Sequence, residues 1–485
     1  MENRKFDVKH CVLLPIVLTV TVFLWCAPSS FFGSLGAALT VTQQRTIAIF
    51  AFAALMWIFE IVPNWVTSLM VIVISLLTIS NKSISFCMNT GDDSVFVPMK
   101  ELMRSFSDPV VMLFLGGFVL AIVAAKYGID VTMARILLKP FGKKPRIVLL
   151  GVLIVISVFS MFMSNTATAA MFLAFLAPVF AALPDTDRKG KVGIALAIPI
   201  AANIGGIGTP IGTPPNATAV GNLDSLAGIT ISFGEWALRM IPFVIVMILF
   251  AWLLLCFFYP FKSKEIVLEI KKEKKEKTYK DYVAWITFGL TILLWMTEEL
   301  HGINSNIVAL IPLVIYTSTG VFTSEDIKEI NWSVLWLVAG GFALGYALDG
   351  TGLAKALVES IDFSSMSIVV VLVVAGLLCY VLSNFISNSA TAALLIPIMI
   401  TMGKGLMESS NSEMFMAFGG QAGLSVFVAI CASVAMCLPI STPPNAIAAS
   451  TGLVETKDMT KVGLIVGAVG LVLGFFWVTK FFTFS

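Results

Sequence analysis

Two polar motifs, each set inside a long apolar run, occur twice in this chain. Ser-Asn-Thr-Ala-Thr-Ala-Ala at 164–170 returns as Ser-Asn-Ser-Ala-Thr-Ala-Ala at 387–393, and Thr-Pro-Pro-Asn-Ala stands at 213–217 and again at 442–446. Hydroxyls, carboxamides and broken helices are costly inside a membrane unless they line a cavity. Their repetition in corresponding positions of two halves is typical of the binding site of a secondary transporter.

The composition places most of the chain in lipid. Of the 485 residues, 58% are hydrophobic and 12% are charged, whereas a soluble domain carries roughly 25% charged residues. We therefore expect an all-α polytopic membrane protein with about 11 transmembrane helices and two re-entrant hairpins. The seven cysteines form no C-x-x-C pair, so neither a disulfide framework nor a zinc site is expected. We find no enzyme motif and expect no resident cofactor and no nucleic-acid partner.

A lysine-rich segment divides the chain. Residues 261–280 are expected to form a cytoplasmic basic linker between a first repeat, 44–260, and a second repeat, 281–485. An N-terminal span and loop, 1–43, precedes them. Because basic residues favour the cytoplasmic side, their distribution also predicts a cytoplasmic N-terminus.

Four segments carry the polar motifs. The stretch 147–183 would be about 55 Å long as a helix, too long for one span, and basic residues flank both ends. It is therefore expected to enter and return on one side, as a re-entrant hairpin, and 369–402 is expected to do so from the opposite side. Helices broken at the double prolines are expected at 192–220 and 415–450. The two repeats would then be inverted.

A helix that starts inside the membrane presents free N–H groups and a partial positive charge, and it can bind a carboxylate. Asn165 and Asn388 can donate or accept hydrogen bonds there. Carbonyl groups released by the proline breaks, at Gly212 and Ser441, suit a small cation such as Na⁺. Neither motif contains Lys, Arg or His. Two such sites related by pseudo-symmetry favour a ligand with an anionic group at each end, a dicarboxylate.

At these residues the chain resembles the divalent anion–sodium symporter (DASS) family, which includes the INDY-type di- and tricarboxylate carriers. The resemblance implies a plasma-membrane homodimer surrounded by lipid, in which a transport domain moves against a scaffold like an elevator. It implies substrate contacts at Asn165, Thr166, Thr213, Pro214, Asn388, Ser389, Thr442 and Pro443. It implies a first cation site at Ser160, Ser164, Asn165 and the Gly212 carbonyl, and a second at Ser383, Ser387, Asn388 and the Ser441 carbonyl.

The second half departs from the family pattern. Ser389 replaces the usual threonine, Asn384 stands where glutamate is common, and Ser441 stands where alanine is frequent. These departures favour exchange of dicarboxylates (succinate, malate, fumarate or 2-oxoglutarate) with weak sodium dependence, while Na⁺ symport stays open. The alternatives are a Na⁺-coupled symporter of citrate or sulfate and, from a different class, an anion channel, against which the two hairpins argue.

Overall fold

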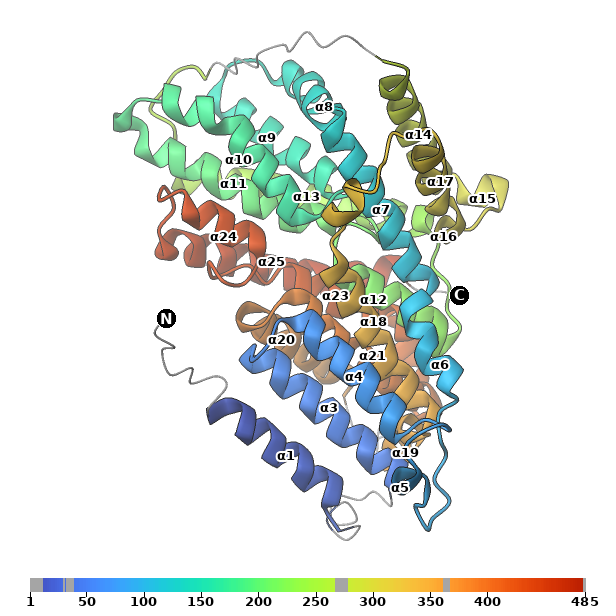
Figure 1. Cartoon of the computed structure of the whole chain (residues 1–485). Helices are drawn as coiled ribbons and strands as arrows, with labels where there is room; N and C mark the ends of the chain where they lie inside the picture. Colours follow the sequence, from blue (N-terminus) through green and yellow to red (C-terminus); the bar gives the residue numbers. More distant parts are fainter. Residues whose placement is uncertain (1–11, 29–30, 32–38, 267–277, 361–366, 483–485) are drawn as a thin grey trace, which may run out of the picture.

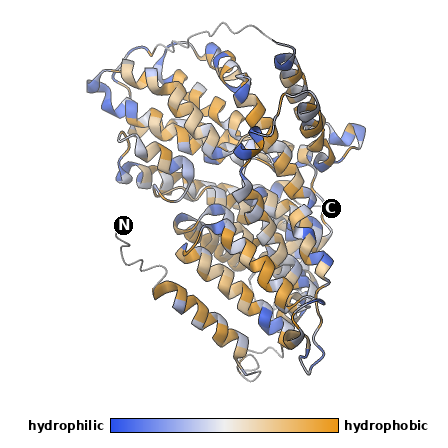
Figure 2. Ribbon diagram, viewed as in Figure 1, coloured by the Kyte–Doolittle hydropathy of each residue, from blue (hydrophilic) through white to orange (hydrophobic). Residues whose placement is uncertain are grey.

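The computed structural model describes residues 12–28, 31, 39–266, 278–360 and 367–482, and Figure 1 shows their arrangement. Most of this part of the chain is helical, and Figure 2 shows hydrophobic residues along the helices, with hydrophilic residues mainly at helix ends and connections. The helices that are long and apolar enough to cross a membrane are Val41–Phe59, Met99–Lys126, Phe233–Phe258, Trp332–Gly350, Ile368–Phe385, Asn388–Glu408 and Thr456–Phe481. Shorter apolar helices accompany them. The all-α polytopic architecture is confirmed.

The first half follows the predicted order of elements. Its helices are α1 (Leu14–Cys26), α3 (Val41–Phe59), α4 (Asn64–Thr78), α5 (Ser85–Met88), α6 (Met99–Arg104), α7 (Pro109–Lys126), α8 (Ile129–Leu138), α9 (Pro145–Ser160), α10 (Asn165–Ala182), α11 (Arg188–Gly206), α12 (Pro214–Asn222) and α13 (Phe233–Phe258). The segment predicted as the first hairpin thus forms α9 and α10. The first predicted broken helix forms α11 and α12, interrupted at 207–213.

The second half repeats this order. Its helices are α14 (Tyr279–Met296), α15 (Glu298–His301), α16 (Ser305–Val308), α17 (Leu310–Ser318), α18 (Trp332–Gly350), α19 (Leu353–Ser360), α20 (Ile368–Phe385), α21 (Asn388–Glu408), α22 (Ser412–Ala417), α23 (Gly420–Ser433), α24 (Pro443–Ser450) and α25 (Thr456–Phe481). The second predicted hairpin corresponds to α20 and α21, and the second broken helix to α23 and α24. The orientation of both hairpins in the membrane stays a prediction. Residues 1–11 and 267–277, which carry much of the predicted cytoplasmic charge, lie outside the described residues.

Two tryptophans show the duplication in three dimensions. The indole N–H of Trp57 in α3 donates to the Asn64 carbonyl oxygen at 3.1 Å, where α4 begins. In the second half, the indole N–H of Trp295 in α14 donates to the Ser305 carbonyl oxygen at 3.0 Å, where α16 begins. Both indoles are fully buried. The same buried bond therefore fastens α3 to the start of α4 in the first half and α14 to the start of α16 in the second.

The paired glycines of α7 and α18 lie at helix contacts that join the two halves. A methyl group at Gly116 would collide with the backbone of Ala309, between α16 and α17, and one at Gly340 would collide with Ser68 in α4. The second contact is the first with the halves exchanged. Glycine permits this close approach of backbones.

The buried apolar side chains form two large clusters. One draws on α9, α10, α11, α13, α20, α23 and α25. The other draws on α3, α4, α7, α14, α17 and α18. Helix α8 connects them, because Ile129 at its start belongs to the second cluster whereas Ala134 and Leu138 belong to the first. These two clusters are separate apolar cores, and short elements such as α8 connect them.

We predict that Gly340→Val lowers the melting temperature of the purified protein by several degrees, because overpacking a close helix contact typically costs about 1–3 kcal/mol. The matched control is Gly289→Ala in α14, where an added methyl group meets open space. The control should melt at or slightly above the wild-type temperature, since alanine favours a helix. A Gly340→Val variant as stable as the control would show that the α4–α18 contact is loose.

Candidate binding site

Four helices begin at one cavity. Helices α10 and α21 start at Asn165 and Asn388, and helices α12 and α24 start at Pro214 and Pro443. Their first residues border a space of about 250 Å³. The structure brings together all eight residues predicted to contact substrate: Asn165, Thr166, Thr213, Pro214, Asn388, Ser389, Thr442 and Pro443. The duplicated motifs therefore meet, two from each half of the chain.

Hydroxyl side chains fix three of the four helix starts. The Ser164 hydroxyl accepts a hydrogen bond from the backbone N–H of Ala167 at 3.2 Å, and the Ser387 hydroxyl accepts one from Ala390 at the same distance. Thr442 caps α24 in the same way, whereas Thr213 caps α12 only through its extended backbone. These caps satisfy some N–H groups and leave others in each first turn directed at the cavity.

The cavity is positive without a charged side chain. Among the described residues that line it, none is Asp, Glu, Lys, Arg or His. A helix N-terminus carries roughly half a positive charge, and four of them converge here. Such ends bind carboxylate, sulfate or phosphate groups through backbone N–H donors. The arrangement is suited to an anion with two separated charges.

The asparagine that follows each double proline closes the break in its helix. The carboxamide NH₂ of Asn216 donates to the carbonyl oxygens of Gly206, Ile207 and Thr209 at 3.0, 3.2 and 2.8 Å. In the second half, the Asn445 NH₂ group donates to Met436 at 2.8 Å and to Leu438 at 2.9 Å.

Sequence reasoning assigned no role to these two residues, although both stand in the repeated Thr-Pro-Pro-Asn motif. A buried carbonyl without a partner is costly. The two carboxamides therefore stabilise the helix breaks at the cavity by bonding to the carbonyl groups that the breaks release.

A cluster of oxygens surrounds the end of the Asn165 carboxamide. That end lies 2.6 Å from the Ser160 hydroxyl, 3.1 Å from the Gly212 carbonyl oxygen and 3.2 Å from the Ala202 carbonyl oxygen. An NH₂ group in this position donates to all three. A carboxamide oxygen in the same position instead completes a set of four oxygen ligands of the kind that hard cations prefer. Three of the predicted first cation ligands are thus together, and Ser164 stands at the same turn.

The corresponding place in the second half is built differently. The Asn384 carboxamide oxygen accepts from the backbone N–H of Cys437 at 2.9 Å, and the Ser441 hydroxyl donates to the Asn384 carbonyl oxygen at 2.9 Å. Two of the three departures from the family pattern therefore bond to each other. The Ser383 hydroxyl and the Asn388 carboxamide oxygen are buried without a hydrogen-bond partner in the described part of the chain.

Three further asparagines border the cavity, and the sequence motifs did not indicate them. Asn64, at the start of α4, donates to the Ser387 hydroxyl at 2.9 Å. Asn203 in α11 donates to the Thr442 hydroxyl at 3.1 Å. Asn331 caps α18. The other residues of the wall that the motifs did not indicate are Phe114, Phe118, Ile211, Val334 and Leu337. A single asparagine in an apolar run was the available signal, and it is too common to point to a site.

A polytopic helical protein with a cavity at the meeting point of two repeated halves has the organisation of a secondary transporter. The family model described as "Citrate transporter" (CitMHS) matches residues 54–419. This chain belongs to that family, and its membership confirms the resemblance to the DASS carriers.

Several transporters are similar to most of this chain. An uncharacterized transporter of Haemophilus influenzae is 30% identical over 447 residues, which cover 88% of this chain and 89% of that protein. The sodium-dependent dicarboxylate transporter SdcS of Staphylococcus saprophyticus is 29% identical over 513 residues, covering 97% of this chain and 91% of that protein. An uncharacterized transporter of Schizosaccharomyces pombe is 30% identical over 445 residues, but the chain spans only 49% of its length.

The solved structure of Neisseria gonorrhoeae MtrF, from a class of antimetabolite efflux pumps, has a similar fold. It superposes with a TM-score of 0.50 at 12% sequence identity, covering 89% of this chain and 97% of that one. This likeness concerns the fold alone.

Proposed function

We propose that this chain is a secondary carrier of dicarboxylates such as succinate, malate, fumarate and 2-oxoglutarate. The observation that carries the proposal is the meeting of four helix N-termini, two from each half, at one cavity whose described lining has no charged side chain. A dianion with its charges at opposite ends matches this pseudo-symmetric arrangement. The similarity to SdcS, a sodium-dependent dicarboxylate transporter, supports the same substrate class.

In this proposal each half of the chain holds one carboxylate. Asn165 and Thr166 act with Thr213 and Pro214 on one side of the cavity. The other carboxylate is held by Asn388, Ser389, Thr442 and Pro443. Backbone N–H groups and carboxamides donate to the carboxylate oxygens. Each helix N-terminus contributes about 0.3–1 kcal/mol, and up to about 2 kcal/mol in partly buried geometry.

The proposed mechanism moves one body of the protein against the other. The two apolar cores support this division: the core with α9, α10, α20 and α25 would form the transport domain, and the core with α3, α4, α7 and α18 the scaffold. The homodimer rests on the family resemblance. The plasma membrane location and the cytoplasmic N-terminus rest on that resemblance and on the distribution of basic residues.

We propose that Na⁺, if it is co-transported, binds at the first oxygen cluster. Ser160, Asn165 and the Gly212 carbonyl would hold it, with Ser164 at the same turn, and its charge would offset part of the negative charge of the substrate. The Asn384–Ser441 bond makes the second half a poorer cation site, because it fixes the position of Ser441, whose carbonyl group would be the ligand.

Citrate is the second candidate substrate, because the matching family model carries that name. Its third carboxylate would need a further donor, and Asn64 and Asn331 at the scaffold side of the cavity are the available ones. Competition of citrate against labelled succinate would rank the two substrates.

We predict that Asn165→Ala and Asn388→Ala each abolish dicarboxylate transport while the protein stays folded. Each carboxamide stands at the first position of a helix that faces the substrate. The control is Asn89→Ala, because Asn89 is an exposed loop residue that is distant in sequence from Asn165 and Asn388. Labelled succinate uptake into proteoliposomes measures the effect. Near-native uptake by either of the first two variants would contradict the paired-site proposal.

Uptake with and without Na⁺, and with and without internal dicarboxylate, tests the coupling. We predict that internal dicarboxylate strongly accelerates uptake, because an exchanger returns across the membrane loaded. We predict that Na⁺ stimulates uptake only moderately, with a hyperbolic dependence, since one cation site is better formed than the other. Strict Na⁺ dependence with a sigmoidal curve and no response to internal dicarboxylate would instead establish plain symport.

A further inference from the structure

A second, partly open space lies between the two cores, away from the substrate cavity. It measures about 180 Å³ and has walls from α7, α8, α9 and α14, together with the turn that follows α9. Its surface is almost entirely apolar, and Asp130 is the one lining residue with a titratable side chain. The lining residues are Ala124, Ile129, Asp130, Met133, Val158, Phe159, Phe162, Met163, Phe288 and Ile292. The hairpin α9–α10 thus faces α14 across a space that contains a single titratable side chain.

That side chain is Asp130, in the first turn of α8, and it is 5% exposed. Its carboxylate accepts a hydrogen bond from the backbone N–H of Val131 at 2.7 Å. Gly128, just before α8, has a φ of 64°, a conformation that glycine adopts without strain. The carboxyl group therefore lies on a connecting helix, because α8 is one of the elements through which the chain passes from one core to the other.

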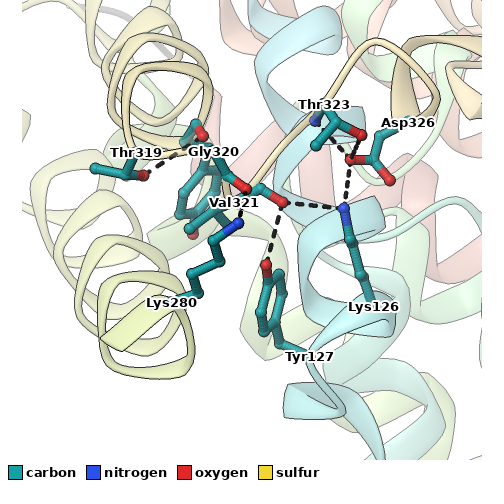
Figure 3. A network of polar contacts seen from close by, with 9 residues as sticks. Lys126, Tyr127, Lys280, Thr319, Gly320, Val321, Thr323 and Asp326 are labelled. Atoms are coloured by element: carbon teal, nitrogen blue, oxygen red, sulfur yellow. Dashed lines mark hydrogen bonds and ion pairs between the residues drawn. The ribbon is translucent and has the colours of Figure 1, made fainter. Parts of the chain in front are cut away.

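The nearest basic residue along the chain is engaged elsewhere. The Lys126 ammonium group at the end of α7 donates to Asp326 at 2.6 Å and to the Val321 carbonyl oxygen at 3.1 Å, and Figure 3 shows it directed at this loop. The Tyr127 hydroxyl donates to the same Val321 carbonyl oxygen at 3.3 Å. These bonds fasten the end of α7 to the α17–α18 connection. The Lys126 ammonium group is therefore paired with Asp326 and not with Asp130.

Other charged or titratable groups stand on the elements that pack against α8 or line the space. They are Lys126 and Tyr127 at the end of α7, Arg135 in α8, Lys139 in the short helix η3 (Lys139–Phe141), Arg146 in α9, and Tyr279, Lys280, Asp281 and Tyr282 in α14. Within the described part of the chain, none of them forms an ion pair with Asp130. A carboxylate here has helix N–H groups as partners but no cation.

Burial raises the pKa of the Asp130 carboxyl above its ordinary value, and the backbone hydrogen bonds at the start of α8 offset this rise only in part. A buried carboxyl beside an apolar space binds a proton more tightly than a hydrated one. By linkage, low pH therefore favours the arrangement in which the Asp130 carboxyl group is shielded from water, and high pH favours an arrangement in which the carboxylate meets water.

We propose that Asp130 is a proton-binding site that links pH to the movement of the α9–α10 hairpin against α14. With the proton bound, the Asp130 carboxyl group stays shielded from water and the hairpin keeps its position relative to α14. With the proton released, the carboxylate must be hydrated, and the hairpin separates more readily from α14. Transport should therefore be slower at low pH, because the protonated protein separates the hairpin from α14 less readily.

The first test measures proton binding to the purified full-length protein without substrate. Infrared titration between about pH 5.5 and 8.5 should show a protonated carboxyl band that disappears as pH rises and is missing in Asp130→Asn. This readout needs no transport, so it separates failure of the proton site from failure of the proposed carrier function. An identical band in Asp130→Asn would overturn the proposal.

The second test measures exchange of fumarate, whose carboxyls stay ionised over this range, in proteoliposomes. Wild-type exchange should rise several-fold with pH, with the midpoint of the infrared titration. Asp130→Asn, which imitates the protonated acid, should exchange slowly and independently of pH. A wild-type rate independent of pH, or an Asp130→Asn profile equal to the wild-type profile, would contradict the proposal.

A third variant covers the case in which Asp130→Asn does not fold. Val158→Thr keeps the shape of the wall and adds a hydroxyl group, which favours the carboxylate over the neutral acid, to the space that Asp130 borders. It should move both the infrared and the exchange midpoint to lower pH by about half a unit to one unit. Unchanged midpoints in a folded Val158→Thr protein would show that this space does not govern the titration.

Discussion

The structure depends on helix N-termini that are held inside the protein with part of their N–H groups unsatisfied. Such ends are unfavourable in an apolar surrounding, and here four of them are brought to one cavity. The double prolines at 214–215 and 443–444 begin two of these helices, where the missing N–H costs nothing. Asn216 and Asn445 then satisfy the carbonyl groups that the breaks release. An anionic ligand completes what the fold leaves open.

The division into two apolar cores gives this cavity a mechanical setting. The motif residues belong to hairpins and broken helices that pack mainly in one core, whereas Asn64 and Asn331 approach from elements of the other. The bond from Asn64 to the Ser387 hydroxyl crosses between the two. A ligand in the cavity therefore contacts both bodies, and movement of one against the other would change its surroundings on one side.

Much of the cavity could be predicted from the sequence because its parts occur twice. A repeated Ser-Asn motif followed by a repeated Pro-Pro-Asn motif is improbable by chance, and pseudo-symmetry requires the copies to meet. Asn64, Asn203 and Asn331 occur once each and resemble ordinary helix contacts. The Asn384–Ser441 bond joins residues that are distant in sequence, so each departure could be seen but not their pairing.

The two cores and the space beside Asp130 could not be predicted from the sequence either. Hydropathy does not separate apolar residues that face lipid from those that face a core, since both surroundings are equally apolar. An aspartate two residues after a glycine at the start of a short helix is typical of an exposed helix start. Only the packing of α7 and α9 against α8 shows that Asp130 is buried.

The most direct test compares the binding of succinate with that of succinamate, its monoamide, to the purified protein by calorimetry. The two ligands have nearly the same shape, but succinamate has one negative charge fewer. If paired helix N-termini hold both ends of the substrate, succinate should bind at least about tenfold more tightly, which corresponds to roughly 1.4 kcal/mol. Equal affinities would contradict a site that recognises two anionic groups.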